Sequence, residues 1–203
     1  MLFLTLLFGF ITSYLGMITP SMLNITALKI SIEKSKNTAL YYSGGVALVV
    51  IFQGYFALFF LKIIYADPTI LETIEIGAII IFSILSIFFF WKAFQDQKEI
   101  VTRKLVKSGF LTGMGLSMIN MFAVPFYCGI GALLNMYGIL ELNITSISFF
   151  VLGSTFGTFL ILYHYILLAE KIKSKISRFS KYLNFFLGGV TGIMALISLI
   201  KIV

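Results

Sequence analysis

Apolar residues occur along this chain in long runs, and the short connections between the runs carry most of the charged residues. A helix that crosses a bilayer needs about 20 apolar residues, because each residue adds only ~1.5 Å to its length. Six runs meet this requirement: residues 2–28, 38–62, 71–94, 109–134, 144–168 and 182–202. The pattern predicts an all-α fold, a polytopic membrane helix bundle of six transmembrane helices in a single domain over residues 1–203.

Lysine and arginine are distributed unevenly among the connections. Three alternate connections hold all but two of the 15 basic residues: Lys29, Lys34 and Lys36; Lys92, Lys98, Arg103, Lys104 and Lys107; Lys171, Lys173, Lys175, Arg178 and Lys181. Short loops rich in Lys and Arg remain on the cytoplasmic side of a membrane. The distribution therefore predicts both termini outside and a cytoplasmic connection at about 92–108.

Similar residues begin corresponding runs in the two halves of the chain. The first run contains Gly9-Phe-Ile-Thr-Ser13 and the fourth Gly109-Phe-Leu-Thr-Gly113, and the run at Tyr41–Gly45 resembles Phe149–Gly153. The halves, about 1–95 and 108–203, each hold three spans, so the second half enters the membrane from the opposite side. This order predicts two inverted three-helix repeats, an arrangement used by many secondary transporters for alternating access.

Two of the three prolines, Pro20 and Pro125, fall inside the first and fourth runs. Proline inside a helix removes a backbone donor and clashes with the carbonyl four residues earlier. Interrupted segments at matching positions point to a midplane binding site, although each proline could also be a plain kink. The predicted site has polar or aromatic neighbours around both prolines: Thr19, Pro20, Ser21 and Asn24 on one wall, and Asn120, Pro125 and Tyr127 on the other.

Two further side chains and a pattern of small residues have two interpretations each. Gln53, in the middle of the second run, either contacts solute or bonds to a neighbouring helix. His164 is either an aromatic-belt residue at the interface or a proton-coupling group, since imidazole changes charge in the physiological pH range. Small residues spaced by four, such as Gly9 and Ser13, either pack the bundle internally or form a homodimer interface.

Composition excludes several classes of function. With 60% hydrophobic and 11% charged residues, the chain differs from soluble domains, where about 45–50% and ~25% are typical. The net charge of +7 lies in loops that would face anionic lipid headgroups, so nucleic acid is not an expected partner. The runs contain no metal-ligand cluster and no catalytic constellation, so we expect no enzyme activity, cofactor or metal. A neutral polar interior suits a zwitterionic or neutral solute.

Two stretches resemble the lysine-exporter-type (LysE-type) translocator family. The run Ile18-Thr-Pro-Ser-Met-Leu-Asn24, a basic turn and Ala39–Gly45 are similar to that family's first two helices, although only the first proline of its Pro-Gly-Pro element is present. Gly109–Gly113 followed by Asn120 is similar to its fourth helix, with the proline displaced to Pro125. The resemblance implies a proton-driven exporter of amino acids or related small solutes in the bacterial cytoplasmic membrane.

Three other interpretations remain at this point. A membrane thiol–disulfide carrier of similar size needs a cysteine in each half, and the chain has only Cys128. A metal-ion efflux protein needs carboxylate or histidine ligands in the membrane, which the runs do not supply. A membrane scaffold or assembly protein without transport needs neither paired cysteines nor metal ligands, but such a function does not explain the paired helix breaks.

Overall fold

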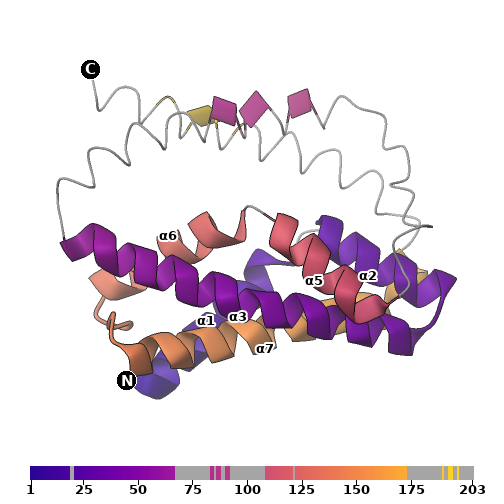
Figure 1. Cartoon of the computed structure of the whole chain (residues 1–203), viewed down its shortest axis with the longest axis horizontal. Coiled ribbons are helices and arrows are strands. Elements are labelled where there is room, and N and C mark those ends of the chain that lie inside the picture. The colour runs from indigo at the N-terminus through magenta and orange to yellow at the C-terminus, as the bar shows by residue number, and fades with distance from the viewer. Residues whose placement is uncertain are drawn as a thin grey trace. The chain divides into compact units, whose positions relative to one another are not determined.

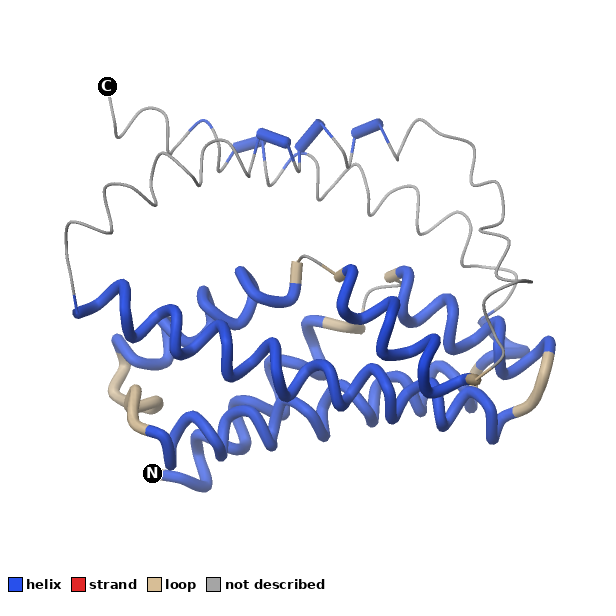
Figure 2. Tube along the Cα trace, viewed as in Figure 1, coloured by secondary structure: helices blue, strands red, loops and turns tan. Residues whose placement is uncertain are grey.

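The structure, a computed structural model, describes residues 1–18, 21–66, 108–120 and 122–172, and the helical positions 83, 84, 86, 87, 90, 91, 189, 192, 193 and 196. Thr19 and Pro20 of the predicted site lie outside the described residues, as do most of the predicted spans 71–94 and 182–202. Helices joined by short loops make up the described part, which contains no strand (Figures 1 and 2). The predicted all-α class is confirmed for these residues.

The helices follow the predicted runs, with two interruptions. They are α1 (Leu2–Gly16), α2 (Met22–Glu33), α3 (Lys36–Ala66), α5 (Gly109–Ile119), α6 (Ala123–Met136), α7 (Ile144–Leu167) and α8 (Ala169–Ile172). The runs 2–28 and 109–134, in which the prolines predict interruptions, each contain two helices, α1 and α2 in the first and α5 and α6 in the second (Figure 1). The spans predicted at 38–62 and 144–168 correspond to α3 and α7.

Two of the described helices, α3 with 31 residues and α7 with 24, are long and apolar enough to cross a membrane. The α5–α6 pair is bent by 66° and would be a third span if it crosses as one unit. α1 is apolar but shorter. The described part therefore has the helices of a membrane-associated protein, as the hydropathy pattern predicts.

The chain divides into two compact units. The first combines residues 1–63 with 102–173, and the second combines 64–101 with 174–203. The first unit holds nearly all the described residues and takes helices from both predicted halves. The fold and site below are those of this unit.

The first N–H groups of a helix have no acceptor within the helix, and here side chains just before the helix starts accept from them. The Asn143 side chain accepts from the Ser146 N–H at 2.8 Å and begins α7. The Ser21 side chain accepts from the Asn24 N–H at the start of α2, and the Ser108 side chain accepts from the Leu111 N–H at the start of α5. Polar residues at these three positions thus set where the helices begin.

Glycines let α1 pack against α7 at backbone distance. A Cβ added at any of three glycines would collide with a backbone carbonyl oxygen of the partner helix: Gly9 with Phe150, Gly153 with Leu6, and Gly157 with Phe10. From Leu6 to Phe10 in α1 the contacted residue in α7 moves from Gly153 to Gly157, so the two helices run parallel. Small residues spaced by four thus serve internal packing here.

The same kind of contact joins α5 to α3. A Cβ would collide with a backbone carbonyl oxygen at three more glycines: Gly109 with Thr38, Gly113 with Tyr42, and Gly45 with Phe110. These helices also run parallel to each other. α3 crosses α7 in the opposite sense, since Gly54 contacts Val151 and the Tyr55 hydroxyl donates to Ser148 at 2.7 Å.

Each end of the first unit gathers segments that are distant in sequence. At one end the Thr5 hydroxyl donates to the carbonyl of Ile139 at 2.7 Å, which places the N-terminus beside the α6–α7 loop (Figure 2). At the other end the Ser31 hydroxyl donates to the carbonyl of Ile166 at 3.4 Å. The second end is where α2 ends and α3 begins, next to Lys34 and Lys36.

Candidate functional site

Two apolar clusters fill the first unit on either side of its middle. The first cluster consists of Val50, Ala57, Leu58, Leu61, Tyr127, Leu134, Leu140, Ile147, Phe150 and Val151. The second cluster consists of Leu23, Ala27, Ile30, Ala39, Tyr42, Val46, Leu162 and Ile166. Along α7 the first cluster ends at Val151 and the second begins at Leu162, and the buried residues between them include Ser154 and Thr158.

A buried polar layer lies between the clusters, and we define it as Ser13, Ser117, Ser154 and Thr158 together with the half-buried Gln53. Ser154 and Thr158 are completely buried near the midpoint of α7, and Gln53 lies near the midpoint of α3. The Ser154 hydroxyl donates to the carbonyl of Gly9 at 3.3 Å. Because α3 and α7 are membrane-length helices, their midpoints fall near the bilayer centre, where polar groups are expensive and mark function.

The break between α1 and α2 is held together by side chains. The Asn24 amide donates to the carbonyl of Met17 at 2.6 Å, and the Tyr165 hydroxyl donates to the carbonyl of Ile18 at 2.8 Å. Ser21 accepts from the Asn24 N–H at 3.5 Å. A break inside a bilayer requires such partners, because lipid offers none. Of the wall predicted around Pro20, the structure thus places Ser21 and Asn24 at the break, with Asn24 completely buried.

The break between α5 and α6 is supported from α3. α5 ends at Ile119 with Asn120 as its C-terminal cap, and the Gln53 amide donates to the carbonyl of Ser117 at 2.9 Å. Of the two interpretations of Gln53, the bond to a neighbouring helix is therefore present. Its amide replaces one of the donors that a continuous helix would have supplied to the last turn of α5.

Pro125 does not interrupt a helix, contrary to the sequence prediction. α6 begins at Ala123, so Pro125 occupies the first turn, where an N–H has no helical partner and its loss costs little. The chain breaks before the proline rather than at it. Pro125 is also exposed, so the structure does not place it in a wall of the buried polar layer.

Tyr127 brings α6 against α1. Its hydroxyl lies 3.2 Å from that of Ser13 in a buried contact, and its ring meets Phe150 edge to face at 6.2 Å. Tyr127 belongs to the first apolar cluster, whereas Asn24 is flanked by Leu23 and Ala27 of the second. The two predicted walls therefore lie in different surroundings, with the polar layer between them.

We expect the Ser13–Tyr127 pair to stabilise the fold measurably. Tyr127→Phe and Ser13→Ala should each lower the free energy of unfolding by about 1 kcal/mol, because each leaves a buried hydroxyl without this partner. The double variant should lose little more than either single variant. Thermal unfolding of the four proteins in detergent measures this, and strictly additive losses would show that the hydroxyls are not coupled.

His164 lies in the last turn of α7 and contacts α1. Its Nδ1 is 3.1 Å from the Tyr14 hydroxyl, and the two rings meet edge to face at 5.8 Å. The half-buried position fits an aromatic residue near the membrane interface, and the hydrogen bond fits a group that exchanges protons. The proton-coupling role of His164 therefore stays a prediction. Cys128 donates to the carbonyl of Ala57 at 3.1 Å, as expected of a packing residue.

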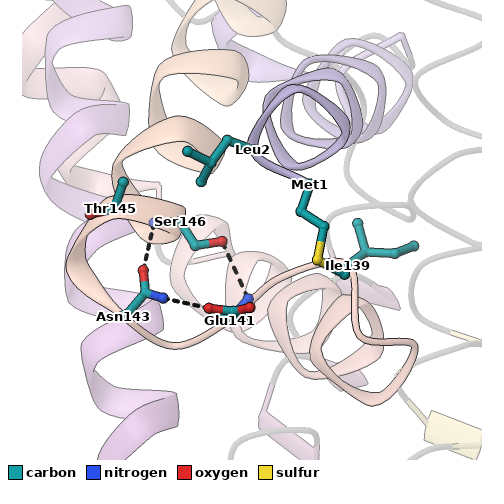
Figure 3. A pocket seen from close by; sticks show the side chains of 7 residues that line it. All are labelled: Met1, Leu2, Ile139, Glu141, Asn143, Thr145 and Ser146. Carbon is teal, nitrogen blue, oxygen red and sulfur yellow. Dashed lines mark hydrogen bonds between the residues drawn. The ribbon is translucent and has the colours of Figure 1, made fainter.

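Two surface hollows accompany these elements. One, of about 290 Å³, lies beside the N-terminus and is lined by Met1, Leu2, Ile139, Glu141, Asn143, Thr145 and Ser146 (Figure 3). Its polar groups bond to one another, since the Asn143 amide donates to Glu141 at 2.6 Å and the Glu141 N–H donates to Ser146 at 3.3 Å. We interpret this network as a brace for the start of α7.

The second hollow, of about 370 Å³, lies at the α5–α6 break. It is lined by Val49, Phe52, Gln53, Phe56, Met118, Asn120 and Val124. Two predicted site residues, Gln53 and Asn120, supply its amide groups. The described part of the chain contains no group of three or more His, Cys, Asp or Glu that could hold a metal ion.

Sequence reasoning missed the part that hydroxyls play in the site. Ser13 and Ser117 entered the prediction only as small packing residues, and Ser154 and Thr158 had no role. Their position inside long apolar runs, away from the charged connections, is the signal that could have found them. Comparison with protein-family models, with curated proteins and with solved structures found no match to the chain.

Proposed function

We propose that the protein is a secondary transporter that exports amino acids or related small polar solutes, driven by the proton gradient. The observation that carries this proposal is the buried polar layer between two apolar clusters, with the α5–α6 break held beside it by the bond from Gln53 to Ser117. A scaffold would gain stability from filling this layer with apolar side chains, since buried polar groups cost free energy unless paired. Broken helices at mid-membrane instead provide backbone and hydroxyl groups to a solute.

The helix contacts support an inverted repeat for this transporter. α1 pairs in parallel with α7, and α5 pairs in parallel with α3, through the same glycine-to-carbonyl packing. The two pairs run in opposite directions, as a two-fold axis in the membrane plane would require. Each pair takes one helix from each half, so the proposed halves interlock. The LysE-type resemblance implies the same kind of export and remains part of the proposal.

The charges of the described residues support the proposed orientation. Lys34 and Lys36 lie in the connection at one end of the first unit, whereas the N-terminus shares a hollow with Glu141 of the α6–α7 loop at the other. Basic short loops remain cytoplasmic. We therefore place the α2–α3 connection in the cytoplasm and the N-terminus outside the bacterial cytoplasmic membrane.

The chemistry of the polar layer favours a solute without net charge. Its members are hydroxyls and amides, and Asp, Glu, Lys and Arg are absent from α1, α5, α6 and α7 and from the middle of α3. An ion with several charges would need opposite charges to replace its hydration. A zwitterion or a neutral polar molecule can be held by hydroxyls, amides and opened backbone.

Efflux of amino acids from cells loaded with dipeptides tests the proposed function. We expect cells that express the protein to release one class of amino acid faster than cells without it, and we expect collapse of the proton gradient to abolish the difference. Pro20→Ala should slow this release while the protein stays folded in the membrane. Equal release of every amino acid, with the protein verified in the membrane, would contradict the proposal.

A further inference from the structure

Two buried oxygen atoms at the end of α5 have no hydrogen-bond partner among the described residues. They are Oε1 of Gln53 and Oγ of Ser117. Ser117 is 1% exposed, so water does not reach its hydroxyl from the surface. Buried polar atoms in native proteins nearly always have a partner, and those that lack one mark a ligand, an ion or an ordered water.

The orientation of the Gln53 amide is determined by its other contact. Nε2 donates to the carbonyl of Ser117 at 2.9 Å, and an exchange of nitrogen and oxygen would place two acceptors against each other. Oε1 therefore points away from that carbonyl as a pure acceptor. The hydroxyl of Ser117, the residue whose carbonyl Gln53 binds, takes no part in that bond and can also accept.

The backbone gives this region a negative potential. α5 ends two residues after Ser117, and the last carbonyls of a helix carry a partial negative charge. Half-helix C-terminal ends hold cations in other transporters for this reason. The carbonyls at this end and the Gln53 Oε1 atom can only accept, so they favour a cation over the carboxylate of a solute.

The hollow of about 370 Å³ lies beside the Gln53 side chain, next to the buried Ser117. Gln53 and Asn120 line it together with apolar side chains. Its volume exceeds the ~30 Å³ of one water molecule many times, which leaves room for a small solute group or an ion. A divalent cation would need several oxygen ligands including carboxylates, and the hollow is lined by none.

We propose that Gln53 Oε1, Ser117 Oγ and the C-terminal end of α5 bind a compact monovalent cation. The cation is either the ammonium group of the transported solute or a free sodium ion; both present one positive charge to neutral oxygens. Where it is the solute's ammonium, this inference rests on the proposed transport function.

Salt-dependent thermal unfolding of the purified full-length protein in detergent tests the site. Methylammonium chloride and sodium chloride are titrated separately, with tetramethylammonium chloride, which is bulky and has no N–H, as the control of equal charge. We expect the unfolding temperature to rise saturably with methylammonium or sodium relative to the control, because a ligand that binds only the folded state stabilises it.

Ser117→Ala should weaken this response about tenfold, since a hydrogen bond to a charged group is lost. Gln53→Leu should remove it, and Ser148→Ala, which alters a hydroxyl at the exposed start of α7, should leave it unchanged. A response to methylammonium alone assigns the solute's ammonium, and a response to sodium assigns a free ion. No saturable difference between the salts, or an unaltered response in Ser117→Ala, overturns the site.

The outcome separates this inference from the proposed function. Amino-acid efflux without any cation response would leave the transporter standing and remove the cation site. A cation response without efflux of any amino acid would leave the cation site standing and remove the proposed amino-acid transport.

Discussion

Gly153→Leu is expected to lower the free energy of unfolding by about 3 kcal/mol and to leave little folded protein in the membrane. The Cβ of any larger residue at this position would collide with the backbone carbonyl of Leu6 in α1. A backbone atom of a packed helix cannot move aside as a flexible side chain can. The two helices would have to separate, and the buried polar layer beside them would lose its geometry. Thermal unfolding and the yield of monodisperse protein measure the effect.

Gly115→Leu is the matched control, because nothing lies within 4 Å of a Cβ at that exposed position of α5. It should change the unfolding temperature little. Gly45→Leu, whose Cβ would collide with the carbonyl of Phe110, should match Gly153→Leu if the two helix pairs are equivalent halves of a repeat. A severe effect at only one of the two glycines would count against that equivalence.

The glycine contacts also revise the register of the proposed repeat. The sequence suggests an offset of 100 residues between the first helices, which aligns Gly9 with Gly109, and an offset of 108 between the second helices. With the offset of 108, Tyr42 corresponds to Phe150. Gly113 packs against the Tyr42 carbonyl and Gly9 against the Phe150 carbonyl, so Gly113 rather than Gly109 corresponds to Gly9. The difference is about one helical turn. Small residues every four positions make such shifts invisible in a single sequence.

Hydropathy was sufficient to predict the class of fold, and prolines alone were not sufficient to place the breaks. α3 and α7 were predicted within a few residues because long uninterrupted apolar runs have one interpretation in a membrane. Pro125 pointed to a break in the correct helix but lies after it, in the first turn of α6. Proline is excluded from helix interiors and accepted at helix starts, so it shows only that a break lies nearby.

Site residues that lie close in sequence to a helix break were predictable, and pairs that are distant in sequence were not. Asn24 and Asn120 lie close in sequence to the breaks that they support. The bond from Gln53 to Ser117 joins residues 64 positions apart, and that from Ser13 to Tyr127 joins residues 114 apart. Such pairs depend on which helices pack together, which hydropathy does not encode.

Asn24→Leu is expected to abolish transport and to lower the free energy of unfolding by about 1–3 kcal/mol. Leucine has nearly the same shape, but it removes the amide that donates to the carbonyl of Met17 at 2.6 Å. The carbonyl lies at a break between helices, where lipid offers no replacement donor. The break should therefore lose its fixed geometry together with its stability. Efflux from dipeptide-loaded cells and thermal unfolding in detergent measure the two effects.

Ser43→Ala serves as the control for this prediction. Ser43 is also completely buried, but its hydroxyl donates at 3.0 Å to the carbonyl of Ala39, one turn earlier in the same helix. That carbonyl keeps its helical N–H partner, so the variant should unfold and transport nearly as the native protein does. If Asn24→Leu abolished efflux with unchanged stability, Asn24 would act on the solute rather than on the break. If it changed neither, the break around Pro20 would not be part of the transport site, because its most buried polar contact would be dispensable.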